Sequence, residues 1–289
     1  MTTPRAGGLE IEAIGGAAGA LVHGVDPRTV NADAVAAIRA ALVERKVVFI
    51  RGAHLEPAEL VAFARNFGDL TVAHPVMPGL AEQPEVLEID AMKSREDPRY
   101  RDEYENDTWH TDVTFMARPP LGSLLSARVV PPAGGDTVFA DMDAAYASLS
   151  APLRTLLDGL TAVHDGRTEF AAFLRTNPDG GTWEGKQFTV LEPVVHPVVR
   201  THPESGRRSL FVNPTFTTHI VELSRPESDA LLGFLYQHAI AQEHLVRWHW
   251  SAGDIAFWDN RSTMHYAVRD YGTAPRVMQR VTLRGDQPA

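Results

Sequence analysis

The stretch Asn106-Asp107-Thr108-Trp109-His110-Thr111-Asp112-Val113-Thr114-Phe115 places a histidine and an aspartate two residues apart, between two aromatic residues. In a β-strand, residues two positions apart point to the same face of the sheet. His110 and Asp112 could therefore present an imidazole nitrogen and a carboxylate oxygen to one metal ion. Such a pair also arises often by chance, so a metal site here requires a third ligand from elsewhere in the chain.

Composition narrows the classes of protein that this chain can belong to. Of its 289 residues, 44% are hydrophobic and 22% charged, which is typical of a globular protein. The net charge of −10 argues against nucleic-acid or membrane-surface partners, and no apolar run reaches the roughly eighteen residues of a membrane span. Because the chain has no cysteine, any metal must be held by His, Asp or Glu. The N-terminus lacks a signal-peptide pattern, and we expect a cytoplasmic protein.

The chain alternates short apolar strands with Gly/Pro turns and a few amphipathic helices. Helices are expected from Asn31 to about Lys46, from Pro57 to about Gly68, after Asp141, after Pro152, and after the capping box Ser224-x-x-Glu227. Strands are expected at 9–26 (two), 47–50, 85–90, 121–130, 137–139, 194–200, 209–212, 245–250, 254–258 and 279–284. Residues 91–107 and 162–190 are expected to be flexible loops that could act as lids.

This order of elements predicts a single domain over residues 1–289. Its fold class would be α+β and β-rich, with a double-stranded β-helix core (a cupin-like jelly roll) braced by helices. No internal repeat or long linker divides the chain.

His265 is the candidate third ligand. Two histidines and one carboxylate on one face of an ion leave positions open for a co-substrate and oxygen, as in the facial triad of non-haem Fe(II) oxygenases. Arg276 and Arg280 follow His265 in the chain. Guanidinium groups form bidentate bonds with carboxylates and sulfonates, so two arginines near the candidate triad in an acidic protein indicate anion binding.

With these residues in place, the chain resembles the taurine dioxygenase family of Fe(II)/2-oxoglutarate-dependent oxygenases over nearly its whole length. The motifs are specific as a set rather than singly. They are Gly19-Ala-Leu-Val-His-Gly-Val-Asp26, Lys46-Val-Val-Phe-Ile-Arg51-Gly, Phe67-Gly-Asp, His74-Pro-Val, Trp109-His-Thr-Asp-Val-Thr-Phe115, Gly134-Gly-Asp-Thr137, His196-Pro-Val-Val-Arg-Thr-His-Pro203, Phe211-Val-Asn213, Phe216-Thr-Thr, Trp258-Asp-Asn-Arg261, His265-Tyr-Ala and Arg280-Val-Thr.

The resemblance implies a role for each candidate residue. His110, Asp112 and His265 would bind Fe(II). The C5 carboxylate of the co-substrate 2-oxoglutarate would be held by Arg276 with help from Thr137. The other roles concern the substrate and the walls of its pocket: His74, Arg280 and the backbone amide of Val113 would hold a sulfonate, Asn106 would lie near an amine end, Phe115 and Phe216 would wall the pocket, and Trp109 and Trp258 would pack around the iron.

The implied reaction consumes O2 and 2-oxoglutarate and hydroxylates the carbon that bears a sulfonate, in taurine or a related alkanesulfonate. It would release sulfite and an aldehyde, with succinate and CO2. The resemblance also implies a homo-oligomer, a dimer or a tetramer.

Two positions depart from the family pattern. Met77 stands where a tyrosine contacting an amine is expected, and Glu169 stands where a small serine is expected. Met77 favours the alternative of an alkyl sulfate ester dioxygenase of the same family, whereas Asn106 and Glu169 favour an amino-sulfonate. A zinc-dependent hydrolase and a non-catalytic cupin-like binding protein are further alternatives, but they would leave Arg276 and Thr137 unexplained.

Overall fold

A large mixed sheet forms the base of the molecule in the computed structural model, which describes residues 8–97, 108–177 and 179–289. Its strand order is β1-β2-β3-β15-β5-β17-β4, and the neighbours are antiparallel except for the parallel pair β2 and β3. The strands are β1 (Glu10–Ala13), β2 (Ala20–His23), β3 (Val47–Ile50), β4 (Leu87–Asp90), β5 (Gly122–Val129), β15 (Ile255–Asp259) and β17 (Val277–Leu283).

Two helices cover the outer face of this sheet. Helix α1 (Ala32–Arg45) begins after Asn31, whose side-chain oxygen accepts a hydrogen bond from the Ala34 amide at 2.9 Å, as a capping residue does. Helix α2 (Pro57–Ala64) begins with a capping box. Strand β3 is buried on both faces because Val48 and Ile50 pack toward the helices while its other two residues point inward.

A second, smaller sheet faces the inner side of the first, with the order β14-β6-β16. Its strands are β14 (Leu245–Trp248), β6 (Thr137–Asp141) and β16 (Thr263–Ala267). Aromatic residues fill the space between the sheets: Phe49 of β3 stacks on Trp248 of β14 at 4.0 Å between ring centroids, and Phe139 of β6 contacts Trp258 of β15. The β-rich α+β class with a jelly-roll core, predicted from the sequence, is therefore confirmed.

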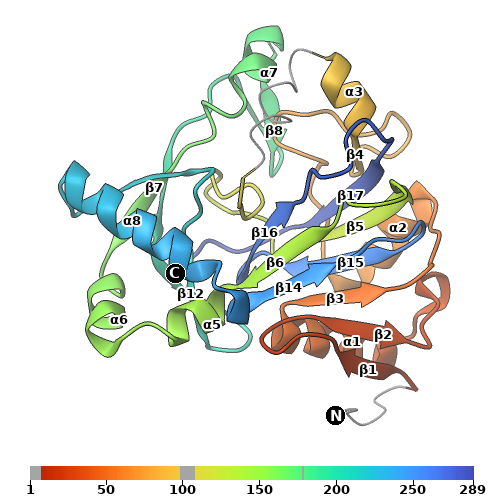
Figure 1. Cartoon of the computed structure of the whole chain (residues 1–289). Coiled ribbons are helices and arrows are strands. Elements are labelled where there is room, and N and C mark those ends of the chain that lie inside the picture. The colour runs from red at the N-terminus through yellow and green to blue at the C-terminus, as the bar shows by residue number, and fades with distance from the viewer. Residues whose placement is uncertain (1–7, 98–107, 178) are drawn as a thin grey trace.

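Further helices, 3-10 turns and short strands surround these two sheets (Figure 1), and the short strands form separate sheets of two or three strands. Helix α8 (Arg225–Ala239) begins with the predicted Ser224–Glu227 capping box. The other helices are α3 (Ala91–Glu96), α5 (Met142–Ala147), α6 (Ala151–Leu157) and α7 (Ala171–Thr176), with 3-10 turns at Pro27–Thr29, Arg65–Phe67 and Gln242–His244. The other strands are β7 (Thr161–His164), β8 (Gly181–Trp183), β9 (Lys186–Phe188), β10 (Val194–Pro197), β11 (Val199–Thr201), β12 (Arg208–Leu210) and β13 (Thr217–Ile220). No described helix combines the length and the apolar character that a membrane crossing requires.

The structure differs from the sequence expectations in several segments, and strands β7 and β13 were not expected. Residues 91–96 form α3 rather than a loop. The expected flexible stretch 162–190 contains α7 and the hairpin β8–β9, because Phe170, Phe173 and Trp183 bury themselves in one apolar cluster. Strand β16 was missed because its five residues, Thr-Met-His-Tyr-Ala, are few and contain only one strongly apolar side chain, so that their strand signal is weak.

Candidate active site

Backbone pairing brings the three candidate metal ligands together. The His110 amide donates to the His265 carbonyl at 3.0 Å, and the His265 amide donates to the His110 carbonyl at 2.7 Å. Asp112 Oδ1 lies 3.9 Å from Nε2 of both histidines. The potential ligand atoms of all three residues lie within 4.8 Å of one another, and no other group of three metal-ligating side chains occurs among the described residues.

The predicted geometry of His110 and Asp112 is wrong in one respect. Only His110 makes a strand-like bridge, and residues 112–115 form a turn instead of continuing a strand. Val113 in this turn has φ 55°, in the left-handed region that a β-branched residue rarely adopts. The buried side chains of His196 and Asn213 fix the turn, since His196 Nε2 donates to the Thr114 carbonyl at 2.9 Å and Asn213 Nδ2 donates to the Thr114 hydroxyl at 3.1 Å. Backbone strain maintained in this way is typical of functional sites.

The protonation states of the triad suit a divalent cation. His110 Nδ1 donates to the Thr108 carbonyl at 2.9 Å, which leaves the lone pair of Nε2 free for a ligand. Burial, and then the neighbouring His110, lowers the pKa of His265 to about 3, so this imidazole is neutral. Burial alone raises the pKa of Asp112, but the Arg280 guanidinium, followed by His265 and His110, holds it well below its usual range. Two imidazoles and one carboxylate are a donor set for non-haem Fe(II).

Arg280 lies on β17 and bonds directly to the triad. Its Nη1 donates to Asp112 Oδ1 at 2.6 Å, and both side chains are buried. Arg280 Nε is also buried and has no hydrogen-bond partner among the residues that the structure covers. The guanidinium thus compensates the Asp112 charge and keeps one unused donor.

Arg276 and Thr137 lie at the turn 134–136, which precedes β6. Arg276 Nε donates to the Gly135 carbonyl at 3.2 Å, and Thr137 Oγ1 accepts a hydrogen bond from Trp250 Nε1 at 3.0 Å. Gly135 has φ 74°, and a Cβ atom there would lie 3.3 Å from the Arg276 side chain. Glycine at this position therefore lets the backbone approach the guanidinium closely.

A cavity of about 200 Å³ is lined by His110 and Asp112 of the triad and by both arginines, whereas His265 is not part of its lining. Of the residues predicted from the sequence, it brings together His74, Met77, His110, Asp112, Val113, Glu169, Phe216, Arg276 and Arg280. Phe115 is buried behind this lining, with its ring 4.9 Å from that of Phe216, and Thr137 is not part of the lining. Asn106 lies outside the described residues.

His74 presents one defined donor. Its Nδ1 accepts hydrogen bonds from the amides of Val76 at 3.2 Å and Met77 at 3.3 Å, so the ring proton resides on Nε2. Burial, and then the positive charge of Arg280, lowers the pKa of His74 well below its ordinary value. His74 is therefore a neutral N–H donor in the wall of the cavity.

The two predicted tryptophans lie on different sides of β16. Trp258 is buried with its ring 4.8 Å from that of His265, on the side of the triad. Trp109 stacks on Tyr266, the next residue of the strand, with ring centroids 5.6 Å apart. Since adjacent strand residues point to opposite faces, Trp258 can influence the His265 ring directly, whereas Trp109 braces the strand from behind.

Sequence reasoning missed several residues of the cavity wall. Phe170 follows the predicted Glu169 and contacts His74, with ring centroids 4.7 Å apart. Leu87 and Ile89 come from the edge strand β4, whose alternation was visible in the sequence. Thr108, Thr215, Arg269 and Tyr271 also line the cavity, and no local pattern distinguished them.

Comparison with known proteins agrees with this geometry. Residues 10–282 match the family described as "Taurine catabolism dioxygenase TauD, TfdA family". An alpha-ketoglutarate-dependent sulfate ester dioxygenase of Pseudomonas putida is 41% identical, over 99% of this chain and 93% of the relative. An alkylsulfatase of Acinetobacter baylyi is 35% identical, over 96% of this chain and 86% of the relative.

A solved structure of a taurine dioxygenase from Burkholderia xenovorans has a TM-score of 0.80 and 38% identity to this chain, covering 97% of this chain and 92% of that one. Both the family match and these relatives extend over nearly all of the residues that form the two sheets and the cavity. The chain therefore belongs to the taurine catabolism dioxygenase family and is an Fe(II)- and 2-oxoglutarate-dependent dioxygenase.

Proposed function

We propose that this dioxygenase hydroxylates the carbon next to a sulfonate or sulfate ester group of a small organic anion, with His110, Asp112 and His265 as its iron ligands. The observation that carries the proposal is the set of donors beside the triad. His74 offers a neutral Nε2–H, Arg280 has an unused Nε, and the strained Val113 contributes a backbone amide at the same cavity. A tetrahedral oxyanion accepts several such hydrogen bonds at once.

The triad fits an iron ion on the chemistry of its donors. Nε2 of His110 carries a lone pair, His265 is neutral, and Asp112 is ionised. His110 and Asp112 line the cavity, and the ligand atom of His265 lies within 4.8 Å of theirs, so an ion held by the three would keep its remaining positions toward the cavity.

Arg276 is the residue that we propose for the distal carboxylate of 2-oxoglutarate, with Thr137 in support. A guanidinium in the cavity wall can bind that carboxylate through two parallel hydrogen bonds. When bound, iron and 2-oxoglutarate supply the oxidising power, because O2-dependent decarboxylation of the co-substrate to succinate drives replacement of a substrate hydrogen by hydroxyl. The protein's own contribution is to hold the target C–H bond in position and to exclude water.

Two substrate classes fit the oxyanion end, and they differ in products. A sulfonate hydroxylated at the adjacent carbon collapses to an aldehyde and sulfite, whereas a sulfate ester gives an aldehyde and sulfate. The apolar part of the lining, including Met77, Ile89 and Phe216, suits the alkyl tail of a sulfate ester. The names of the relatives from Pseudomonas putida and Acinetobacter baylyi support the same class. Glu169 in the wall supports an amino-sulfonate such as taurine.

A substrate panel tests the proposal. The iron-loaded protein would be incubated with 2-oxoglutarate, O2 and taurine, longer aminosulfonates, alkanesulfonates or alkyl sulfates, and succinate, sulfite and sulfate would be measured. We expect succinate formation coupled to sulfite or sulfate release for at least one class. If no member stimulates succinate formation above the substrate-free rate, while the protein binds 2-oxoglutarate normally, the proposal is wrong.

The proposal also includes a single domain over residues 1–289 that works as a cytoplasmic homo-oligomer without a nucleic-acid or membrane partner. Analytical ultracentrifugation would measure the oligomeric state, for which a dimer or a tetramer is expected.

A further inference from the structure

A fully buried polar turn connects β15 to β16, and β16 carries His265. Asp259 ends β15, Asn260, Arg261 and Ser262 form the turn, and each of these four residues is at most 3% exposed. Polar groups are rarely buried at such density without partners, and among these four side chains only Ser262 Oγ has no hydrogen-bond partner among the described residues. The partners of this turn therefore indicate what it does.

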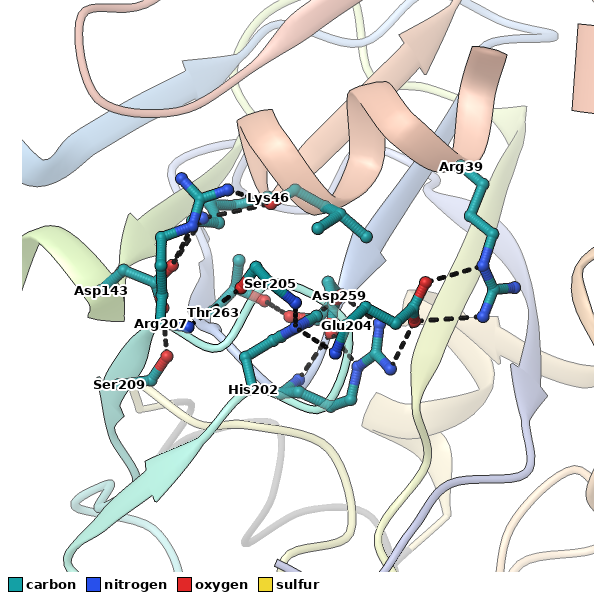
Figure 2. A network of polar contacts seen from close by, with 12 residues as sticks. Arg39, Lys46, Asp143, His202, Glu204, Ser205, Arg207, Ser209, Asp259 and Thr263 are labelled. Atoms are coloured by element: carbon teal, nitrogen blue, oxygen red, sulfur yellow. Dashed lines mark hydrogen bonds and ion pairs between the residues drawn. The ribbon is translucent and has the colours of Figure 1, made fainter. Parts of the chain in front are cut away.

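Two side chains donate hydrogen bonds to Asp259, and the direction of each bond is determined. His202 Nδ1 accepts hydrogen bonds from the amides of Glu204 and Ser205, so its proton resides on Nε2, which donates to Asp259 Oδ2 at 2.9 Å. Arg261 Nη2 donates to the same oxygen at 2.7 Å. Figure 2 shows His202 beside Asp259 and shows Glu204 reaching Arg39 of α1. The turn is thus fixed both to the loop between β11 and β12 and to a helix outside the large sheet.

Asn260 connects this rigid turn to Asp112. The indole N–H of Trp258 donates to Asn260 Oδ1 at 2.9 Å. Asn260 Nδ2 donates to Ser123 Oγ on β5 at 2.8 Å, and Ser123 Oγ donates to Asp112 Oδ2 at 2.5 Å. All four side chains are buried.

The direction of every hydrogen bond in this chain is determined. An indole N–H can only donate, so the oxygen of the Asn260 amide faces Trp258 and its NH2 group faces Ser123. Because that NH2 group also can only donate, Ser123 accepts with a lone pair, and its single proton goes to Asp112. The distance of 2.5 Å is typical of a charge-assisted hydrogen bond from a hydroxyl to a carboxylate.

We propose that Ser123 and Asn260 are positioning residues for Asp112. Ser123, which is itself held by Asn260, donates to Oδ2 and so orients the carboxylate with Oδ1 toward Nε2 of His110 and His265. This inference rests on the proposed function, since it takes Asp112 as a metal ligand. Asn260 belongs to the β15–β16 turn, and Asp259 fixes this turn to the rest of the protein. The turn therefore determines the orientation of Asp112.

The experiment compares metal binding by the full-length protein and two variants, with Co(II) in place of Fe(II). Ser123→Ala removes the hydroxyl, and Asn260→Asp replaces the donor with an acceptor of the same shape that draws the Ser123 proton away from Asp112. Ser126→Ala is the matched control. Ser126 lies on the same strand and is equally buried, but its Oγ has no hydrogen-bond partner among the described residues.

Titration calorimetry measures the Co(II) affinity, and the visible Co(II) spectrum reports the ligand geometry. Ser123→Ala and Asn260→Asp are expected to weaken Co(II) binding about 10–100-fold and to change the spectrum of the saturated protein. Ser126→Ala should change neither. A purely structural role for the chain would lower thermal stability but leave the spectrum of the folded, saturated protein as it is.

The outcomes separate this inference from the proposed function. If the parent protein binds Co(II), and His110→Ala abolishes that binding, the proposed metal site stands. The positioning role is then overturned if the folded Ser123→Ala or Asn260→Asp protein binds Co(II) within threefold of the parent with an identical spectrum. Should one variant fail to fold, the other decides by the same criterion.

Discussion

The free energy of unfolding should depend on Arg280 far more strongly in the metal-free protein than in the metal-loaded protein. Asp112 is 2% exposed and Arg280 9% exposed, and their ion pair is 2.6 Å long. Replacing Arg280 with Met keeps most of the apolar stem but leaves a buried carboxylate without its counter-charge. Breaking a buried ion pair by removal of one partner destabilises proteins by about 3–5 kcal/mol. We expect a loss of this size in the free energy of unfolding when the protein is kept metal-free with a chelator.

A divalent ion bound at the triad supplies the missing positive charge to Asp112. The loss caused by Arg280→Met should then fall to about 1.5–3 kcal/mol, the contribution of one hydrogen bond to a charged group. The difference of about 1.5–2 kcal/mol must appear reciprocally in metal affinity. The variant should therefore bind Co(II) roughly 10–30-fold more tightly than the parent does, since about 1.4 kcal/mol corresponds to a factor of ten.

Urea unfolding with and without Co(II), together with calorimetric titration, measures both quantities. Lys46→Met is the matched control because Lys46 forms a buried ion pair with Asp143 at 2.6 Å (Figure 2), and neither residue lines the cavity. Its stability loss should not depend on the metal. Arg280→Met could instead lose equal stability with and without Co(II), or bind Co(II) no more tightly than the parent does. Either result would refute the argument that Arg280 compensates the charge of Asp112 in the metal-free protein.

Three further predictions follow from single contacts. Arg276→Met should weaken anaerobic binding of 2-oxoglutarate about 10–100-fold, because it removes a charge-assisted pair; unchanged affinity in a titration of the Fe(II) protein would contradict the assignment. His74→Leu should raise the KM for the sulfonate or sulfate ester by a similar factor while the Kd for 2-oxoglutarate stays constant, and a change in both would show a general disturbance of the cavity. Burial lowers the pKa of His196 to about 4. The unfolded chain therefore binds more protons below about pH 6.5, and this residue makes the protein less stable by about 2 kcal/mol at pH 5 than at pH 7. His196→Gln, which keeps a donor for the Thr114 carbonyl, should reduce the pH dependence of the urea midpoint by that amount, and an unchanged slope would disprove it.

Local patterns in the sequence predicted the elements whose signals are local. Asn31, Asp141 and the Ser224–Glu227 pair each cap the helix that they were expected to begin. The apolar run 47–50 is a strand buried on both faces. These features depend on hydrogen bonds and apolar periodicity within a few residues, so they can be predicted from the sequence alone.

Segments whose structure depends on distant partners were predicted poorly. Strand β16 is paired with β6, and its own five residues give only a weak strand signal. Helix α7 and the hairpin β8–β9 form over an apolar cluster with Phe115 and Phe216, which are far away in the chain. For such segments, burial against other elements overrides local propensity.

The sequence by itself determined the chemistry available to the active site. Because the chain has no cysteine, its metal ligands can only be nitrogen and oxygen atoms, and its arginines indicate anion binding. The residues concerned are His110, Asp112, His265, Arg276 and Arg280. Only the tertiary structure decided how these residues interact. Arg280 lies on the inner face of β17, which is paired with β5 so that Arg280 faces Leu125 and Thr282 faces Ser123, and this register brings both Arg280 and Ser123 to Asp112. Strand register is fixed by the burial of whole sheet faces, a long-range property that no short stretch of sequence contains.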